Sequence, residues 1–191
     1  MDAALKRAQS LVGSNYDGGR PEDDFYPTPP GATRALLSVE KFDKYIWEPA
    51  CGDGAISKVL IEAGHNVFST DLNDHGYGSA GIDFLNAVTF TENQVVTNPP
   101  FKLADQFVTK CVTLGIEKFA LLCKLQFLEG QKRSKILQSS GLARVWIFSK
   151  RLSLTRNGLP MKNGGMIAFA WFCFERGYTG KPEIGWIESI D

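Results

Sequence analysis

The sequence contains little of what a zinc site requires. Its 191 residues include only two histidines, and its four cysteines form no CxxC pair. Structural zinc sites need four closely spaced cysteine or histidine ligands, so this chain is poor material for one. The neighbouring Asp74 and His75 do not change this view, and we expect no bound metal. We expect the cysteines to be reduced thiols; they are Cys51, Cys111, Cys123 and Cys173.

An excess of charge and a long apolar run are also missing. The 21 basic and 21 acidic residues cancel, whereas proteins that coat nucleic acid by bulk electrostatics are usually strongly basic. No stretch of about 18 consecutive apolar residues is present, and the start, MDAALKRAQSLVGS, lacks the apolar run of a signal peptide. We therefore expect a cytoplasmic protein without a membrane segment, in the host cytoplasm if a phage encodes it.

The remaining sequence is that of one globular domain. Residues 1–24 predict a short helix followed by a flexible, acidic Gly-Pro connector, and residues 25–191 predict a single catalytic domain. Strand and helix patterns alternate from Pro30 onwards, which predicts an α/β fold with a mostly parallel sheet and helices on both faces. The strands are predicted at 44–50, 65–72, 94–100, 118–125, 143–149 and 165–175, and the helices at 30–42, 55–64, 103–115 and 129–141. The last two strands lack a helix between them, so we expect an antiparallel hairpin at one sheet edge.

A glycine-rich turn follows the first predicted strand, in WEPACGDGA. Ligands of open α/β sheets bind at the carboxyl ends of strands, where Gly52 and Gly54 would let a ligand approach the backbone. Glu48, just before the turn, would repel a pyrophosphate but would suit a cationic group such as the amino acid end of S-adenosylmethionine. The turn therefore favours a methyl donor over a dinucleotide.

Two further acids follow at useful positions. Asp71 ends the second strand about 20 residues after the turn, where a carboxylate can accept both ribose hydroxyls or, alternatively, cap a helix. Asp83 precedes Phe84, and this pair could hold an adenine amino group and pack on the adenine face.

The most specific motif is NPPF, at the end of the third predicted strand. An exocyclic amine on a base is a poor nucleophile because its lone pair is delocalised. The side-chain oxygen of Asn98 and the carbonyl of Pro99 could hold both N–H bonds of that amine and direct its lone pair at a methyl group. Pro99 and Pro100 lack a backbone N–H and have a fixed φ, which would keep the loop rigid. Phe101 could stack on the planar acceptor.

In these residues the chain resembles the class I S-adenosylmethionine-dependent methyltransferases of the adenine-N6 type. Asn98 to Phe101 match the motif [DNS]PP[YFW], and Glu48, Pro49, Gly52 and Gly54 match EPxxGxG. FYPTPP resembles the N-terminal cofactor segment of that family, in the gamma order of motifs. The resemblance covers about residues 25–177 and implies a Rossmann-like fold with a seven-stranded sheet. The chain resembles the small, phage-like members of this family, because no segment of the sequence is long enough for a target-recognition domain.

The resemblance also implies site residues. Asn98, Pro99, Pro100 and Phe101 would hold the acceptor, and Lys124 and Gln126 fall where the family places further acceptor-pocket groups. The residues implied to hold the cofactor are Tyr26, Thr28, Pro29, Glu48, Ala50, Gly52, Gly54, Asp71, Leu72, Asp83 and Phe84. One departure is Ile56, which stands where many relatives have an aromatic residue.

A basic segment between the last two predicted strands is the best candidate for nucleic-acid contact. Four cations occur in thirteen residues of a neutral chain, which suits phosphate binding, although a solvated hairpin loop would look the same. These cations are Lys150, Arg151, Arg156 and Lys162. The cluster Lys132, Arg133 and Lys135 is interpreted as a solvent-facing helix surface.

The sequence therefore predicts methyl transfer from S-adenosylmethionine to N6 of adenine in DNA. Two alternatives stay open. The same motif marks enzymes that methylate adenine or guanine in RNA or glutamine in proteins, and a non-catalytic cofactor- or nucleic-acid-binding subunit could keep the fold. The target sequence and the oligomeric state do not follow from the sequence.

Overall fold

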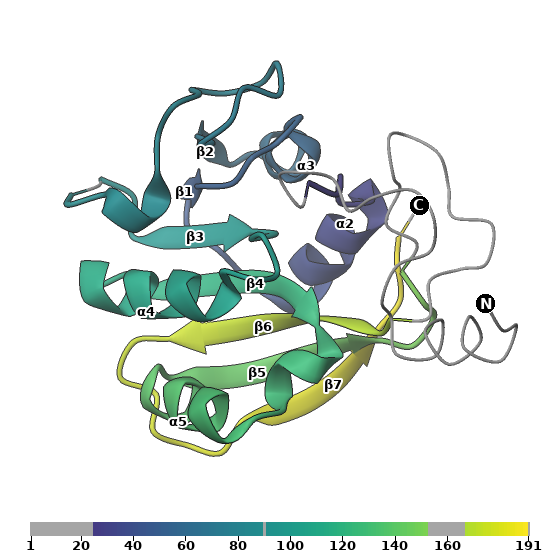
Figure 1. Ribbon diagram of the computed structural model, residues 1–191. Coiled ribbons are helices and arrows are strands. Elements are labelled where there is room, and N and C mark those ends of the chain that lie inside the picture. Colours follow the sequence, from purple (N-terminus) through teal and green to yellow (C-terminus); the bar gives the residue numbers. More distant parts are fainter. Residues whose placement is uncertain (1–24, 90, 153–166, 191) are drawn as a thin grey trace, which may run out of the picture.

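The described residues form a seven-stranded sheet with helices on both faces (Figure 1). The computed structural model describes residues 25–89, 91–152 and 167–190, so the expected N-terminal helix lies outside it. The strands are β1 (Tyr45–Glu48), β2 (Asn66–Ser69), β3 (Gln94–Thr97), β4 (Lys118–Lys124), β5 (Leu142–Phe148), β6 (Phe169–Glu175) and β7 (Glu183–Ile187). The α-helices are α2 (Pro30–Val39), α3 (Ala55–Glu62), α4 (Ala104–Leu114) and α5 (Gln131–Ser139). Each predicted helix and strand within these residues is present, so the predicted fold class is confirmed.

The strand order is β2-β1-β3-β4-β6-β5-β7. Neighbours pair in parallel except at β6, which runs antiparallel to both β4 and β5. The expected antiparallel pair of C-terminal strands is therefore present, but it does not form the sheet edge. β7, which the sequence analysis did not predict, pairs in parallel with β5 and forms that edge.

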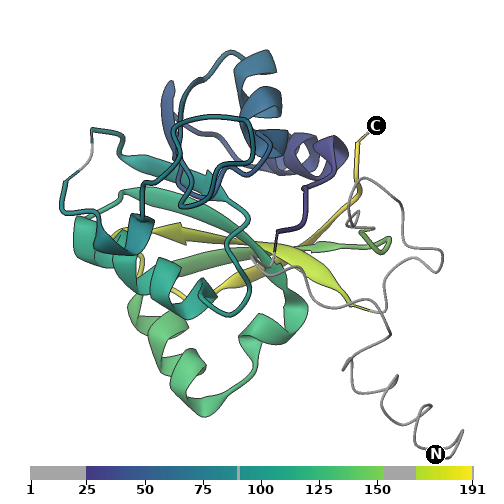
Figure 2. The same ribbon diagram turned by 45° about the horizontal axis from the view of Figure 1, so that its top comes forward.

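Side chains that alternate along the strands divide the core into two layers. Ile46 and Val96 point to the face covered by α2 and α3, whereas Trp47 and Val95 point to the face covered by α4 and α5. Figure 2 shows these two helix pairs on opposite sides of the sheet. Trp171 on β6 is fully buried, as are Phe172 and Phe174 on the same strand.

The parallel strands bring three loops to one edge of the sheet. β1, β3 and β4 run in the same direction, so the glycine turn, the NPPF motif and Lys124 all follow the carboxyl ends of strands. β6 begins at the same edge, because Phe169 pairs with Lys124. All four cysteines are free and buried, as predicted. No helix within the described part of the chain is long and apolar enough to cross a membrane.

Candidate cofactor cavity and acceptor motif

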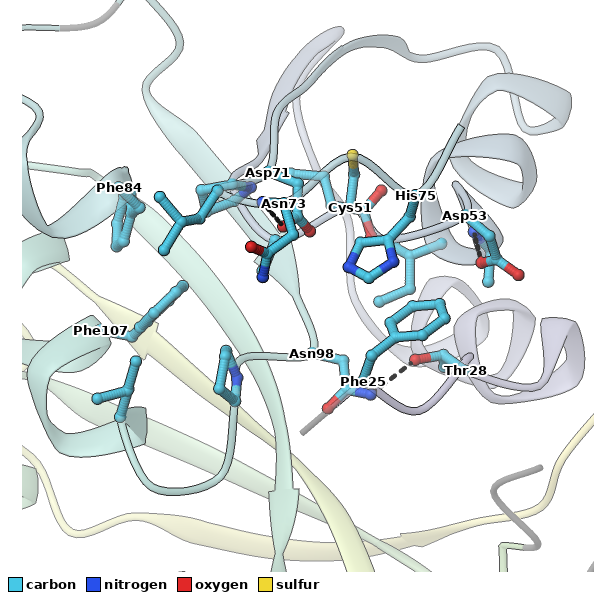
Figure 3. Close-up of a pocket in the computed structure, with 18 of the residues that line it drawn as sticks. Phe25, Thr28, Cys51, Asp53, Asp71, Asn73, His75, Phe84, Asn98 and Phe107 are labelled. Atoms are coloured by element: carbon cyan, nitrogen blue, oxygen red, sulfur yellow. Dashed lines mark hydrogen bonds between the residues drawn. The ribbon is translucent and has the colours of Figure 1, made fainter. Parts of the chain in front are cut away.

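A cavity lies at this edge, where the loops after β1, β2 and β3 meet the segment before α2 (Figure 3). Eight of the residues predicted to hold a cofactor line it; these are Tyr26, Thr28, Glu48, Ala50, Asp71, Leu72, Asp83 and Phe84. Asn98 and Pro100 also line it. The structure therefore brings together residues from four separate segments. Pro29, Gly52 and Gly54 do not line the cavity.

The lining of the cavity is acidic. Glu48, Asp53, Asp71 and Asp83 contribute carboxyl groups, and no lysine or arginine occurs among the described lining residues. An anionic group such as a pyrophosphate would be repelled, whereas a cationic ligand would be attracted. Asp53 was not predicted as a site residue, although it lies within the predicted turn.

Glu48 is the most deeply placed of these acids. It is 1% exposed, and Ser57 Oγ donates a hydrogen bond to its Oε2. Burial raises the pKa of Glu48 well above its usual value, even though the hydrogen bond from Ser57 lowers it, and the nearby Asp53 and Asp71 raise it further. A cation in the cavity would oppose these effects and favour the ionised carboxylate.

Asp71 fixes the glycine turn. Its Oδ2 accepts a hydrogen bond from Gly52 N at 2.9 Å, and its Oδ1 accepts one from Asn73 N at 2.9 Å. Both carboxylate oxygens therefore already hold backbone groups. Carboxylate oxygens have further lone pairs, so ribose binding by Asp71 stays a prediction.

The glycines of the turn are needed for aromatic rings. Gly52 has φ +53° and Gly54 has φ +79°, a region that glycine adopts without steric cost. A Cβ atom at Gly52 would lie 2.2 Å from the ring of Phe25, and one at Gly54 would lie 2.5 Å from the ring of Tyr77. The close approach to this backbone that the sequence suggested for a ligand is made here by side chains.

Phe25 and His75 both line the cavity, which the sequence analysis missed. Their rings stack with centroids 4.3 Å apart. The cavity volume is about 100 Å³, below the range of roughly 300–1,000 Å³ usual for ligand pockets, so a ligand the size of a nucleoside needs some lining side chains to move. The sequence analysis considers His75 only as a metal ligand. Among the residues that the structure describes, no cluster of potential metal ligands occurs.

Asp83 and Phe84 both have structural contacts. Asp83 caps the short 3-10 helix η1 (Phe84–Asn86), because its Oδ1 accepts from Leu85 N at 2.9 Å. Phe84 is 2% exposed and packs between Trp47 and Phe107. The ring is therefore almost fully covered, and the packing of an adenine on its face stays a prediction.

The amide of Asn98 has a fixed orientation. Its Nδ2 donates to the carbonyl of Tyr26 and to Oγ1 of Thr28, both at 3.1 Å. Its Oδ1 is buried and has no hydrogen-bond partner among the described residues. A buried acceptor without a partner is costly, so this oxygen would gain a hydrogen bond from any ligand group that donates one. The amide thus keeps one acceptor oxygen that no described group satisfies, and its role in binding an acceptor amine stays a prediction.

The other residues of the motif point in two directions. Pro99 is buried, and Pro100 lines the cavity, whereas Phe101 lines a second, wider groove next to it. Lys124 and Gln126, predicted as acceptor-pocket residues, line the same groove as Phe101. The motif therefore stands between the acidic cavity and this groove.

The predicted basic segment is only partly described. Lys150 and Arg151 follow β5 and are exposed, and Lys150 lies 3.8 Å from Glu188. Arg156 and Lys162 lie outside the described residues. The role of this segment in nucleic-acid contact stays a prediction.

Comparisons with known proteins agree on the fold. No protein-family model and no curated protein matches the sequence. Among solved structures, a proposed RNA methyltransferase from Pyrococcus horikoshii has a TM-score of 0.62 at 12% identity, with 92% of this chain and 98% of that chain covered. A proposed class I S-adenosylmethionine-dependent methyltransferase from Listeria monocytogenes has a TM-score of 0.60 at 12% identity, covering 95% and 71%.

A third similar structure is a modification subunit of a proposed type I restriction enzyme from Vibrio vulnificus. Its TM-score is 0.60 at 14% identity, with 94% of this chain covered. The chain spans about half the length of that subunit, 48%. At these identities the comparisons establish a Rossmann-like methyltransferase fold.

Proposed function

We propose that this protein transfers a methyl group from S-adenosylmethionine to an exocyclic amine, N6 of adenine in DNA. The observation that carries the proposal is the buried, partnerless Oδ1 of Asn98, held in place by Tyr26 and Thr28 beside an acidic cavity. The methyltransferase fold of the similar structures supports the reaction class.

The acidic cavity suits this donor. S-adenosylmethionine carries a positively charged sulfonium, which makes its methyl group electrophilic, and an ammonium group. Glu48 would face the methionine end, and Asp71 and Asp83 would face the nucleoside end. The absence of basic side chains from the described lining argues against a phosphate-bearing cofactor.

The acceptor side of the reaction depends on the NPPF motif. Asn98 Oδ1 and the Pro99 carbonyl would accept the two N–H groups of the amine and orient its lone pair towards the donor methyl. The N–CH₃ bond forms as the S–CH₃ bond breaks, and the amine then loses one proton to water. Catalysis would rest on positioning and on electrostatic fit, with no covalent enzyme intermediate.

A filter assay with tritiated donor on unmethylated DNA tests the proposal. Wild-type protein should label DNA, and Asn98→Ala should lose turnover while it retains donor binding by calorimetry. Absence of label on DNA with donor binding intact would remove the DNA assignment, and an active Asn98→Ala variant would show that the amide does not hold the acceptor.

Mass spectrometry of nucleosides from expressing cells separates the remaining acceptors. N6-methyladenine in DNA supports the proposal, whereas N6-methyladenine or N2-methylguanine in RNA points to an RNA enzyme. A non-catalytic subunit is tested by calorimetry with S-adenosylhomocysteine, and no binding at high micromolar concentration would support that role against ours.

A further inference from the structure

One wall of the cavity does not follow a strand. It consists of four consecutive residues that precede α2, all of which line the cavity; these are Phe25, Tyr26, Pro27 and Thr28. We refer to residues 25–28 as the N-terminal wall. Figure 3 shows Phe25 and Thr28 on the same side of the pocket as Asn98. The N-terminal wall therefore lies between the cavity and the acceptor motif.

The N-terminal wall also holds the acceptor motif at both of its ends. The carbonyl of Tyr26 and Oγ1 of Thr28 each accept a hydrogen bond from Asn98 Nδ2 at 3.1 Å. The ring of Tyr26 stacks on the ring of Phe101, with the centroids 6.0 Å apart and the planes 21° apart. Tyr26 thus contacts the first residue of the motif through its backbone and the last through its side chain.

Phe101 belongs to the groove on the other side of the motif. This groove measures about 650 Å³, within the range of roughly 300–1,000 Å³ usual for ligand pockets, and the ammonium of Lys124 lies 4.7 Å from the centroid of the Phe101 ring. Arg133 lines the same groove, and its Nε lies 2.8 Å from Asp105 Oδ1, which corrects its interpretation as part of a solvent-facing surface. Tyr26 therefore reaches from the cavity lining to a ring that faces the groove.

The cavity has to change when a donor enters, because its volume of about 100 Å³ is too small for a nucleoside. The ring of Phe25 lies against the glycine turn, where a Cβ atom at Gly52 would be 2.2 Å from it. The other face of this ring stacks on His75. A donor that approaches the glycine turn has to displace the ring of Phe25, which belongs to the residue next to Tyr26.

We propose that Tyr26 is a positioning residue that couples the donor cavity to the acceptor motif. Donor binding shifts the N-terminal wall to an arrangement in which Tyr26 holds Phe101 and Asn98 ready for the acceptor. A donor can do this only if it binds that arrangement more tightly than the ligand-free one, and the acceptor must then strengthen donor binding by the same factor. This inference rests on the proposed function for the identity of the donor and the acceptor.

A fluorine label on Phe101 tests the coupling without an acceptor. Fluorophenylalanine at position 101 gives a resonance that reports the surroundings of that ring, and the ligand is S-adenosylhomocysteine. The ligand should shift this resonance in the otherwise wild-type protein and in Tyr26→Phe, which keeps the ring. Tyr26→Leu removes the ring but keeps the backbone carbonyl that holds Asn98. This variant should still bind the ligand by calorimetry, whereas the shift should be lost.

DNA affinity measures the same coupling from the acceptor side. The probe is a fluorescein-labelled, single-stranded oligonucleotide that contains adenine. Saturating S-adenosylhomocysteine should tighten its binding to wild type by at least about fivefold, and Tyr26→Leu should reduce this factor to about one. Phe169→Leu is the matched control, because Phe169 packs on Phe101 with centroids 5.6 Å apart but is not among the described residues that line the cavity. It should weaken DNA binding equally with and without the ligand.

Three results would overturn the inference: bound S-adenosylhomocysteine that leaves the fluorine resonance unmoved, an equal shift in Tyr26→Leu, or wild-type DNA affinity that ignores the ligand. Failure to bind S-adenosylhomocysteine would refute the proposed function and the inference together. Methyl transfer to DNA is assayed separately. A shift that depends on the Tyr26 ring, without methyl transfer or DNA binding, would refute the DNA acceptor alone. Methyl transfer without the shift would refute the role of Tyr26 alone.

Discussion

Nδ2 of Asn98 donates a hydrogen bond to Oγ1 of Thr28, 3.1 Å away and 70 residues apart in the sequence. This bond, with the one to the Tyr26 carbonyl, decides which end of the amide is left to bind a ligand. A rotated amide would present donors to an amine that is itself a donor. The segment before α2 thus sets the polarity of the acceptor motif.

Thr28→Val should therefore lower turnover about three- to tenfold, because valine has a similar shape but cannot accept the hydrogen bond. Thr28→Ser keeps the hydroxyl and should stay close to wild type. Single-turnover rates with saturating donor measure the effect. Equal rates in the valine and serine variants would show that Thr28 does not orient the amide.

Glu48→Gln should stabilise the ligand-free fold and weaken donor binding. The folded-state pKa of Glu48 lies above its unfolded value, so the folded chain binds the proton more tightly and the free energy of unfolding falls as pH rises between these two values. Glutamine removes this dependence of stability on pH. Each 1 kcal/mol gained in the free energy of unfolding raises the melting temperature by about 2–4 °C. Melting curves from pH 5 to 8, with and without S-adenosylhomocysteine, measure both effects.

The same carboxyl predicts a proton release. A cationic donor favours the ionised form, so wild-type affinity for S-adenosylmethionine should rise with pH and calorimetry in buffers of different ionisation enthalpy should detect the released proton. Glu48→Gln should release none. Stronger donor binding by the variant would contradict the placement of the cation near Glu48.

Gly52→Ala should destabilise the fold by more than the cost of its backbone conformation. A positive φ costs a residue with a side chain about 1–2 kcal/mol in the free energy of unfolding. Here the new Cβ would also lie 2.2 Å from the ring of Phe25. Gly64→Ala is the matched control, because Gly64 has φ +95° and nothing within 4 Å of an added Cβ. Adding Phe25→Ala should rescue part of the loss in Gly52→Ala and none in Gly64→Ala, as measured by urea unfolding.

Glu40 should make the fold sensitive to acid. Burial alone would raise its pKa, but hydrogen bonds from Arg144, Lys118 and Trp146 lower the pKa of Glu40 to about 2. Ionised Glu40 therefore adds to the free energy of unfolding above about pH 4.5, and this stabilisation is lost as pH falls towards 2. Glu40→Gln should cost up to about 3 kcal/mol at pH 7 and flatten the acid limb of the stability curve. Glu62→Gln, at an exposed ion pair with Arg34, should change stability little.

Buried strands were predictable because their pattern is simple. β3 and β4 are short runs with apolar interiors, and β3 is followed by Asn98 and two prolines, which cannot continue a strand. β7 gives no such signal, since Ile184 and Trp186 are 56% and 69% exposed and Gly185 interrupts the run. The glycine is explained only by the folded chain, because a Cβ at position 185 would lie 2.1 Å from the ring of Trp146.

The candidate site was predictable where its residues follow strands. Glu48 and Asn98 are fixed by the ends of β1 and β3, so local sequence was enough to place them at one edge. The stacking of Phe25 on His75 depends on two loops that meet only in the folded chain. Phe25 begins the FYPTPP segment, but no pattern in the sequence pairs this segment with His75. The cation over Phe101 is likewise a tertiary contact, visible only once β4 and the motif lie side by side.

The antiparallel strand β6 affects which part of the chain can vary in sequence without disturbing the sheet. Because β6 runs against its neighbours, the connection from β5 to β6 leaves and re-enters the sheet at the rim of the acceptor motif. Segments of other length or composition could be exchanged at this position without altering a strand pairing. The surface beside the motif can therefore vary while the paired strands are kept.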